Sequence, residues 1–216
     1  MWENYWQKTK IDNIWQKPDK HIVELASKLK EENKLKVLDF GCGCCRHAIY
    51  LAQMGFKVYA CDPSRDAIRY CKKEFEKYGL SGYLAYSDYN QIPFKNIMFD
   101  WLIVFNVIYH NLFNDMIKTI NKFYNVLNSK GYLFLTLLSK NNSKYGKGIE
   151  LEPDTFIYDK TPLSHEKEIP HHFSDEKEIR ILLKNFRILS VTEEKDSYSS
   201  FEKNFKSIHW YILCQK

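Results

Sequence analysis

The sequence predicts an α/β fold in which a mostly parallel sheet carries helices on both faces. Five apolar segments alternate with helical patterns, as expected for βαβ units. The last two apolar segments, Ile188–Glu193 and Ser207–Cys214, have no helical pattern between them, so we expect an antiparallel pair. A glycine turn also joins the first predicted strand to a helix. These observations together predict a doubly wound sheet of seven strands.

The first βα unit is the most informative segment of the chain. An apolar strand around Val37 runs directly into Gly41 and Gly43, and the helix Arg46–Met54 follows. Glycines let the chain reverse without Cβ clashes. The helix N-terminus then presents free N–H groups and the positive end of a dipole to whatever lies above the turn. This arrangement is typical of a cofactor-binding turn.

The second unit adds an acidic residue at a matching position. Gly55 ends the first helix, and the strand Lys57–Cys61 leads into Asp62. An acid at this strand end, roughly 20 residues beyond the glycines, is placed to bind both hydroxyls of a ribose. Arg46 stands where the dinucleotide fingerprint requires its third glycine, so the pattern departs from that fingerprint.

The remaining elements follow from apolar periodicity and turn signals. We expect a helix capped by Ser64, strands Gly82–Ser87 and Phe99–Phe105, a helix through Ile117–Leu127, a turn at Asn128–Gly131, a strand Tyr132–Leu138 and a helix starting at Ser174–Glu176. The polar segment Ser139–Phe173 is predicted to be an irregular insertion. Long connections in compact domains usually carry function.

Length and composition favour a single globular domain over residues 1–216. The chain is 44% hydrophobic, which fills a core of that size, and its net charge of +5 comes from 32 basic and 27 acidic residues without a basic tail. A nucleic-acid partner is therefore not expected. The polar N-terminus and the lack of a long apolar run predict a protein without a signal peptide or membrane span.

The cysteines are expected to be reduced thiols of a cytoplasmic protein. Four of the six fall in or beside the predicted cofactor strands, where disulfides would distort the site. The motif at Cys42, Cys44 and Cys45 lacks the distant second pair of a structural zinc site, so no metal is predicted. We interpret these cysteines as small residues packed in a tight turn.

The motifs resemble those of class I S-adenosylmethionine-dependent methyltransferases. The resemblance rests on Leu-Asp-Phe-Gly-Cys-Gly ending at Gly43, on Arg46-His47, and on Val-Tyr-Ala-Cys-Asp-Pro-Ser ending at Ser64, and it extends over about Leu35–Lys216. It implies a Rossmann-like seven-stranded sheet, S-adenosylmethionine as cofactor and S-adenosylhomocysteine as product. The nearest type is the small-molecule group around the ubiquinone-pathway and tellurite-resistance enzymes.

The same resemblance assigns cofactor contacts to the carboxyl ends of the predicted strands. Asp39 and the turn would hold the methionine part, Asp62 the ribose and Asp88 the adenine amino group. The full set is Asp39, Gly41, Cys42, Gly43, Arg46, Asp62, Pro63, Asp88, Tyr89, Asn106 and Val107. Asp62 could instead serve as a charge at the next helix N-terminus, and Asp88 could belong to a loop turn.

Acceptor chemistry is predicted from two histidine-containing segments. Tyr109 and His110 follow the fourth strand, where an acceptor would meet the methyl group, and His110 is a candidate general base or substrate ligand. The alternative is a capping or packing histidine. His171 and His172 lie where the insertion returns to the sheet. We predict Tyr109, His110 and His172 as catalytic residues and His171 as a substrate ligand.

Two segments are predicted to cover the acceptor. The leader 1–33 contains Trp6 and Trp15 as candidate substrate contacts, although its aromatic residues could simply cover a core edge. The insertion 139–173 would form the second cover. A closed site of this kind excludes water from the reacting centre.

The predicted function is methyl transfer to a small-molecule acceptor. The segment Asn106–Asn111 replaces the [DNS]-Pro-Pro-[YFW] signature, which argues against adenine-N6 and glutamine amide methyltransferases. Two alternatives stay open: a tRNA-modifying methyltransferase of the wobble-uridine type, and a non-catalytic S-adenosylmethionine-binding regulatory protein. We expect a monomer or homodimer.

Overall fold

A computed structural model describes residues 16–88, 91–95, 98–158, 168–195 and 206–216. The predictions for Trp6, Trp15 and Tyr89 lie outside the described residues. The chain divides into two compact units, which are described separately. The first contains the described residues up to 103 together with 127–131. The second contains 104–126 and the described residues from 132 onward.

The first unit contains a parallel sheet in the order β3-β2-β1-β4. Its strands are β1 (Lys36–Phe40), β2 (Lys57–Asp62), β3 (Tyr83–Tyr86) and β4 (Phe99–Val104), whose last residue belongs to the second unit. In this register Asp39 lies between Ala60 of β2 and Ile103 of β4. The central strands are buried on both faces, which explains their nearly continuous apolar sequences.

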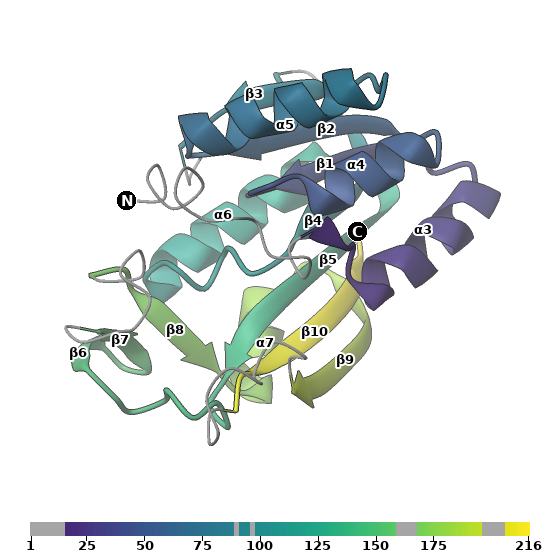
Figure 1. The fold of residues 1–216 in the computed structure, drawn as a ribbon. Coiled ribbons are helices and arrows are strands. Elements are labelled where there is room, and N and C mark those ends of the chain that lie inside the picture. Colours follow the sequence, from purple (N-terminus) through teal and green to yellow (C-terminus); the bar gives the residue numbers. More distant parts are fainter. Residues whose placement is uncertain (1–15, 89–90, 96–97, 159–167, 196–205) are drawn as a thin grey trace. The chain divides into compact units, whose positions relative to one another are not determined.

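The described residues of the first unit form three helices: α3 (Lys20–Glu31), α4 (Arg46–Gln53) and α5 (Arg65–Lys77). In Figure 1, α5 runs alongside β2 and β3. The side chain of Ser64 begins α5 as predicted, because its Oγ accepts a hydrogen bond from the Ala67 amide at 3.1 Å. Residues Ala67, Ile68, Cys71 and Phe75 form the buried face of this helix.

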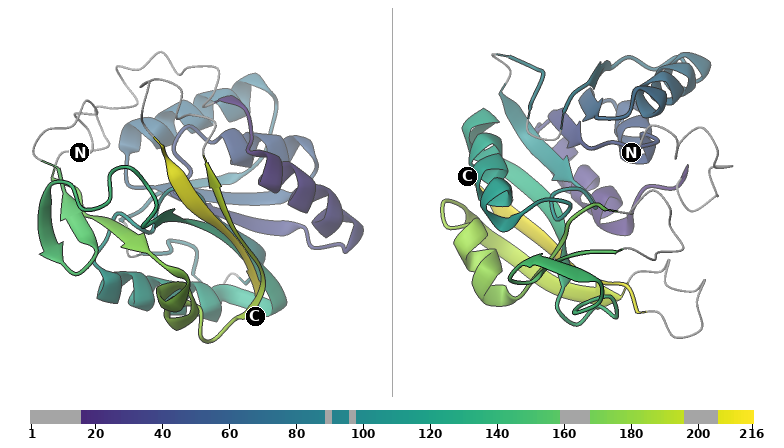
Figure 2. Two further views of the ribbon diagram at one scale, coloured as in Figure 1. Left: turned by 90° about the horizontal axis from the view of Figure 1, so that it is seen from below. Right: turned by 90° about the vertical axis from the view of Figure 1, so that its left-hand side faces the viewer.

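The second unit is built around β5 (Leu127–Ser139), whose first five residues belong to the first unit. The antiparallel strand β10 (Ile208–Gln215) pairs with β5 on one side and with β9 (Arg187–Lys195) on the other. Figure 2 shows β10 and β9 curving together. The predicted antiparallel pair at the end of the chain is therefore confirmed. Helix α6 (Phe113–Val126) precedes β5.

The insertion is more regular than the sequence predicted. It contains β6 (Ile149–Glu152) and β7 (Thr155–Ile157), which form an antiparallel hairpin, and β8 (His171–Ser174), which pairs with β7 and runs parallel to β5. The prediction of an irregular segment was wrong because β6 is largely exposed and lacks a buried apolar face. With these strands the described residues contain ten strands instead of seven.

Two predicted boundaries also need correction. The expected turn at Asn128–Gly131 belongs to β5, and α7 (Glu176–Leu182) begins after Asp175 rather than at Ser174. The Asp175 carboxylate accepts hydrogen bonds from two amides of the first turn, and Glu178 completes a capping box. The predicted fold class is nevertheless confirmed: a Rossmann-like mixed α/β sheet, mostly parallel in its first unit, with flanking helices.

Candidate cofactor and acceptor sites

The glycine turn adopts the backbone conformation that the sequence predicted. Gly41 and Gly43 have φ values of 74° and 51°, in the region that favours glycine. The amides of Gly41 and Cys42 both donate hydrogen bonds to the Cys61 carbonyl, at 2.8 and 3.0 Å. The turn is therefore fixed to the end of β2, and α4 starts directly after it.

Asp62 holds this turn through its side chain. One carboxylate oxygen accepts a hydrogen bond from the Gly43 amide at 2.8 Å, and the other accepts one from the Ser64 amide at 2.9 Å. The side chain is buried. Each oxygen has a second lone pair, so Asp62 retains acceptor capacity toward a hydroxyl group. The structure thus gives Asp62 a positioning role that the sequence did not reveal.

Asp39 is a buried carboxylate at the C-terminal end of β1. Only 1% of the residue is exposed, and its Oδ2 has no hydrogen-bond partner within the described part of the chain. Burial raises its pKa to about 7, although the Arg46 guanidinium and the Ala48 amide act in the opposite direction. A buried carboxylate oxygen without a hydrogen-bond partner fits a cationic ligand group, because the positive charge would supply the partner that Oδ2 lacks.

The other predicted residues of the first unit differ in exposure. Arg46 is buried, and its guanidinium donates a hydrogen bond to the Lys17 carbonyl at 3.4 Å. Asp88 is exposed and accepts a hydrogen bond from the Tyr86 hydroxyl at 3.2 Å. Pro63 is partly buried beside Asp62. Of the predicted cofactor contacts, Arg46, Asp62 and Asp39 are therefore buried, whereas Asp88 is exposed.

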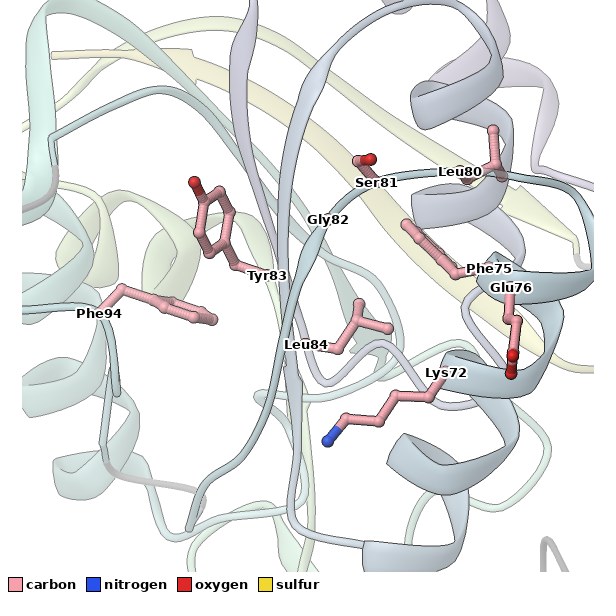
Figure 3. A pocket seen from close by; sticks show the side chains of 9 residues that line it. All are labelled: Lys72, Phe75, Glu76, Leu80, Ser81, Gly82, Tyr83, Leu84 and Phe94. Carbon is pink, nitrogen blue, oxygen red and sulfur yellow. The ribbon is translucent and has the colours of Figure 1, made fainter.

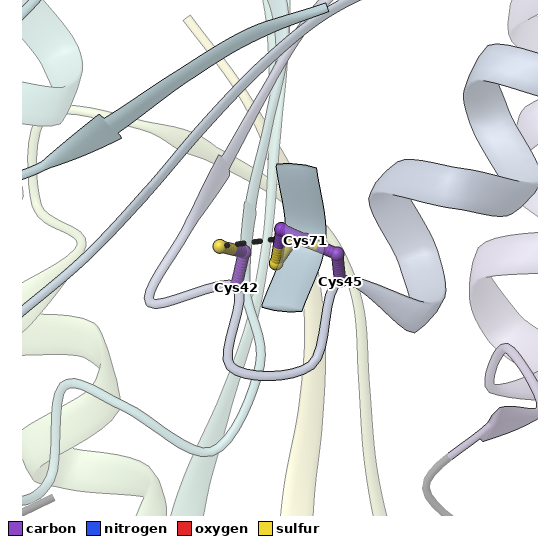
Figure 4. A group of neighbouring side chains, drawn as sticks. All are labelled: Cys42, Cys45 and Cys71. Atoms are coloured by element: carbon purple, nitrogen blue, oxygen red, sulfur yellow. Dashed lines mark hydrogen bonds between the residues drawn. A yellow bond between two sulfur atoms is a disulfide. The ribbon is translucent and has the colours of Figure 1, made fainter. Parts of the chain in front are cut away.

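The cysteines differ from the prediction of reduced thiols. Cys45 and Cys71 form a disulfide that joins the start of α4 to α5. Figure 4 shows Cys42 beside this bond, with its Sγ 3.5 Å from that of Cys45. The Cα atoms of the bonded residues lie 5.7 Å apart, within the normal range for a disulfide.

In the second unit, Asn106 has a conformation that few residues other than glycine adopt. Its φ is 57°, and Thr136 fixes it from β5. The Thr136 hydroxyl accepts a hydrogen bond from the Asn106 amide at 2.8 Å and donates one to Asn106 Oδ1 at 2.9 Å. The Val107 carbonyl accepts a hydrogen bond from the His110 amide at 3.1 Å. Thr136 was missed because a lone threonine in an apolar strand has no distinguishing pattern.

The predicted acceptor residues Tyr109, His110 and His171 lie together. The rings of Tyr109 and His110 are 4.4 Å apart, and those of His110 and His171 are 4.7 Å apart, measured between centroids. Tyr158, which the sequence analysis missed, lies 4.8 Å from His171, and His209 lies 5.7 Å from Tyr109. These five residues are called the imidazole cluster below. Their segments are distant in the sequence, so only the fold reveals the cluster.

His171 and His172 point to different partners, as expected for neighbours in a strand. His171 Nδ1 lies 2.8 Å from the Ile169 carbonyl, so this nitrogen bears the proton. His172 Nδ1 instead contacts Thr155 Oγ1 at 2.7 Å, and its ring lies 5.0 Å from that of Phe113. Burial lowers the pKa of His172 to about 4, so its imidazole is neutral at physiological pH.

The described residues of the first unit also form a groove. Figure 3 shows it between α5 and the edge strand β3, open to solvent. Its lining residues are Lys72, Phe75, Glu76, Leu80, Ser81, Gly82, Tyr83, Leu84 and Phe94. None of the predicted site residues lines it.

Comparison with known proteins identifies the class of the domain. A family model described as a methyltransferase domain matches residues 37–131. A SAM-dependent methyltransferase structure from Methanosarcina mazei is 21% identical, with a TM-score of 0.70, and the match covers 87% of this chain and 96% of that one. The TehB structure from Haemophilus influenzae is 20% identical, with a TM-score of 0.69 and coverage of 100% and 67%.

A third similar structure was determined with bound SAH. It is the magnesium protoporphyrin IX methyltransferase from Synechocystis PCC 6803, which is 17% identical with a TM-score of 0.64 over 91% of this chain and 82% of that one. A search among curated proteins finds no relative. Residues 37–131 therefore match a methyltransferase domain, and the chain has the fold of SAM-dependent methyltransferases, which confirms the resemblance. None of the helices in its described residues is long and apolar enough to cross a membrane.

Proposed function

We propose that this protein binds S-adenosylmethionine in its first unit and transfers the methyl group to a small-molecule acceptor. The main observation in support is the Oδ2 atom of buried Asp39 beside the glycine turn, which has no hydrogen-bond partner among the described residues. S-adenosylmethionine bears an ammonium group and a sulfonium centre, and a buried carboxylate without a partner suits such a cation. Similar folds determined with bound SAH and SAM support the same ligand.

Each residue of the first unit then has a distinct proposed role. The backbone of Gly41–Gly43 lets the cofactor approach closely, and Asp39 binds its positive methionine part. Asp62 accepts hydrogen bonds from the ribose hydroxyls with its remaining lone pairs while it continues to hold Gly43. Arg46 and Pro63 line the edge of this site. Asp88 contacts the adenine from its exposed position. The backbones of Asn106 and Val107 are proposed as further contacts.

When bound, the cofactor supplies an electrophilic methyl group, whose former sulfur partner retains the bonding electron pair. The protein has to orient the acceptor, exclude water and receive the acceptor's proton where one is lost. We propose that His110 accepts the proton that the acceptor loses. Tyr109 and His171 flank its ring and orient the acceptor within the imidazole cluster. Neutral His172 is a second candidate base, although its contact with Thr155 occupies one of its ring nitrogens.

The proposal is tested by separating cofactor binding from turnover. Calorimetry with S-adenosylhomocysteine should show binding without added metal. Turnover with a panel of small acceptors should fall by about 100-fold or more in His110→Asn, with binding unchanged. His209→Asn is the matched variant, because it alters another cluster histidine to which no proton transfer is assigned. Absence of binding would overturn the cofactor assignment. Binding without turnover on any small acceptor would favour a regulatory protein.

A further inference from the structure

Three cysteines near the glycine turn form a group whose sulfur atoms have no part in the proposed methyl transfer, although the backbone of Cys42 belongs to the proposed cofactor turn. The Sγ atoms of Cys42, Cys45 and Cys71 all lie within 4.8 Å of one another. Two of them are joined as a disulfide and are fully buried, whereas Cys42 is 8% exposed. Since a disulfide-bonded sulfur has no proton to donate, the 3.5 Å contact between Cys42 and Cys45 places a thiol directly against a disulfide (Figure 4).

We propose that these cysteines form a thiol–disulfide exchange centre, in which Cys42 is the exchanging thiol and small-molecule thiols and disulfides are the reactants. The Cys42 thiol loses its proton, the turn shifts so that its sulfur comes into line with the Cys45–Cys71 bond, and this sulfur then attacks Cys45 Sγ. A Cys42–Cys45 disulfide forms as the Cys45–Cys71 bond breaks, and Cys71 leaves as a thiolate that takes up a proton. This step moves the disulfide without net oxidation or reduction.

External thiols complete the cycle. Two small thiols convert the protein disulfide into two protein thiols and become one small-molecule disulfide, so electrons and protons balance. The reverse reaction restores the bond. Cys42 is buried but is the least enclosed of the three, so in the proposed cycle external reactants reach the fully buried pair through it. This chemistry does not depend on the proposed methyl transfer.

Migration of the disulfide would change how the turn is held. In the observed form, the bond ties the residue that begins α4 to the middle of α5, and Cys71 Sγ lies 3.3 Å from the Gly43 carbonyl oxygen. In the migrated form, the bond links two residues of the same turn, and α5 is released from it. The conformation of the Gly41–Gly43 backbone thereby becomes coupled to the thiol state.

The surroundings of Cys42 determine how fast the exchange proceeds. Burial and the nearby carboxylates of Asp62 and Asp39 raise the pKa of its thiol. Only the thiolate attacks a disulfide. The exchange is therefore slow at neutral pH and accelerates as the pH rises, and this acceleration should depend on Cys42.

The test follows disulfide positions in the full chain. The oxidised protein is incubated with glutathione at several pH values, quenched with acid, alkylated and mapped by mass spectrometry. We expect Cys42 to appear in a disulfide with Cys45 or with glutathione. Opening of the Cys45–Cys71 bond should slow by about tenfold or more in Cys42→Ser. Cys44→Ser is the matched control, since Cys44 is buried in the same turn but lies outside the trio.

Three results would overturn the proposal: opening at the original rate in Cys42→Ser, absence of Cys42 from every disulfide, or free Cys45 and Cys71 thiols after treatment with oxidised glutathione. Cys42→Ala repeats the kinetic test with a different side chain, and circular dichroism checks that each variant is folded. Mapping of the unmodified chain decides the question even where a variant fails to fold.

Discussion

The carboxylate of Asp62 accepts a hydrogen bond from the amide of Gly43 across 2.8 Å. The acid at the end of β2 therefore fixes the glycine turn that follows β1. One side chain both holds the turn and faces the proposed ribose position, so its loss should affect stability and binding together. This double role distinguishes Asp62 from a residue that only contacts a ligand.

Replacement of Asp62 by alanine should weaken S-adenosylhomocysteine binding by about 1–3 kcal/mol and also lower the free energy of unfolding, because two amides lose a charged acceptor. Calorimetry and denaturant unfolding measure the two effects. Asp115→Ala is the control, since Asp115 pairs with exposed Lys118 at the surface. Unchanged affinity in Asp62→Ala would remove Asp62 from the cofactor site.

Asp39 should make cofactor binding depend on pH. Its pKa of about 7 means that the carboxyl is largely protonated at pH 6, and a bound cation favours the ionised form. Affinity should therefore rise by up to about tenfold per pH unit below pH 7 and level off above it. Calorimetry in buffers of different ionisation heat should detect proton release, and Asp39→Asn should abolish it. A pH-independent affinity would contradict the assignment of Asp39 to the cation.

The same residue affects stability with a defined sign. The folded-state pKa of Asp39 lies above the unfolded value of 3.8, so the folded protein binds more protons between about pH 4 and 7. Its contribution to stability is fully present at low pH and is lost as the pH rises through this window. The difference in unfolding free energy between the wild type and Asp39→Asn should follow this course.

The sequence predicted the segment from β1 to β2 well because its signals are local. Apolar strands, Gly41, Gly43 and the Ser64 cap each determine the backbone within a few residues. The hairpin of β6 and β7 was missed because Ile149 and Leu151 are 56% and 48% exposed, so burial does not mark the strand. The disulfide was missed because residues 26 positions apart meet only through the packing of α4 and α5.

The acceptor residues illustrate the same limit. The sequence singled out Tyr109 and His110 from their place after the fourth strand, and His171 from its place where the insertion returns to the sheet. The structure shows the ring of His110 next to the rings of both other residues. The sequence could not reveal Thr136 or Thr155, whose hydroxyls position Asn106 and His172. A threonine within an apolar strand looks the same whether or not it orients a functional residue.

The Cys45–Cys71 disulfide should stabilise the first unit. It closes a loop of 26 residues, for which chain entropy predicts about 3.5 kcal/mol. Cys71→Ser should lower the free energy of unfolding by this amount, and added reductant should then have little further effect. Denaturant unfolding with and without reductant measures both. Equal stability of the oxidised wild type and Cys71→Ser would mean that the bond does not constrain the unfolded chain.

His172 should make the protein less stable in mild acid. Its pKa is lowered to about 4, so the unfolded chain binds a proton near pH 6.5 that the folded protein does not accept until about pH 4. The stability that it contributes is therefore lost as the pH falls between these values, by about 2 kcal/mol from pH 7.5 to 5. Asp39 changes the stability with pH in the opposite direction. The difference in unfolding free energy between the wild type and His172→Gln therefore has to be measured at each pH.

Thr155→Val provides the matched comparison for His172. It removes the 2.7 Å contact with Nδ1 but leaves the buried imidazole in place. We expect it to lower stability by about 1–3 kcal/mol because a buried polar atom loses its partner, and to retain the acid sensitivity that His172→Gln removes. Urea unfolding at pH 5 and 7.5 separates the two variants. If His172→Gln loses as much stability between these pH values as the wild type, the acid sensitivity arises from another group.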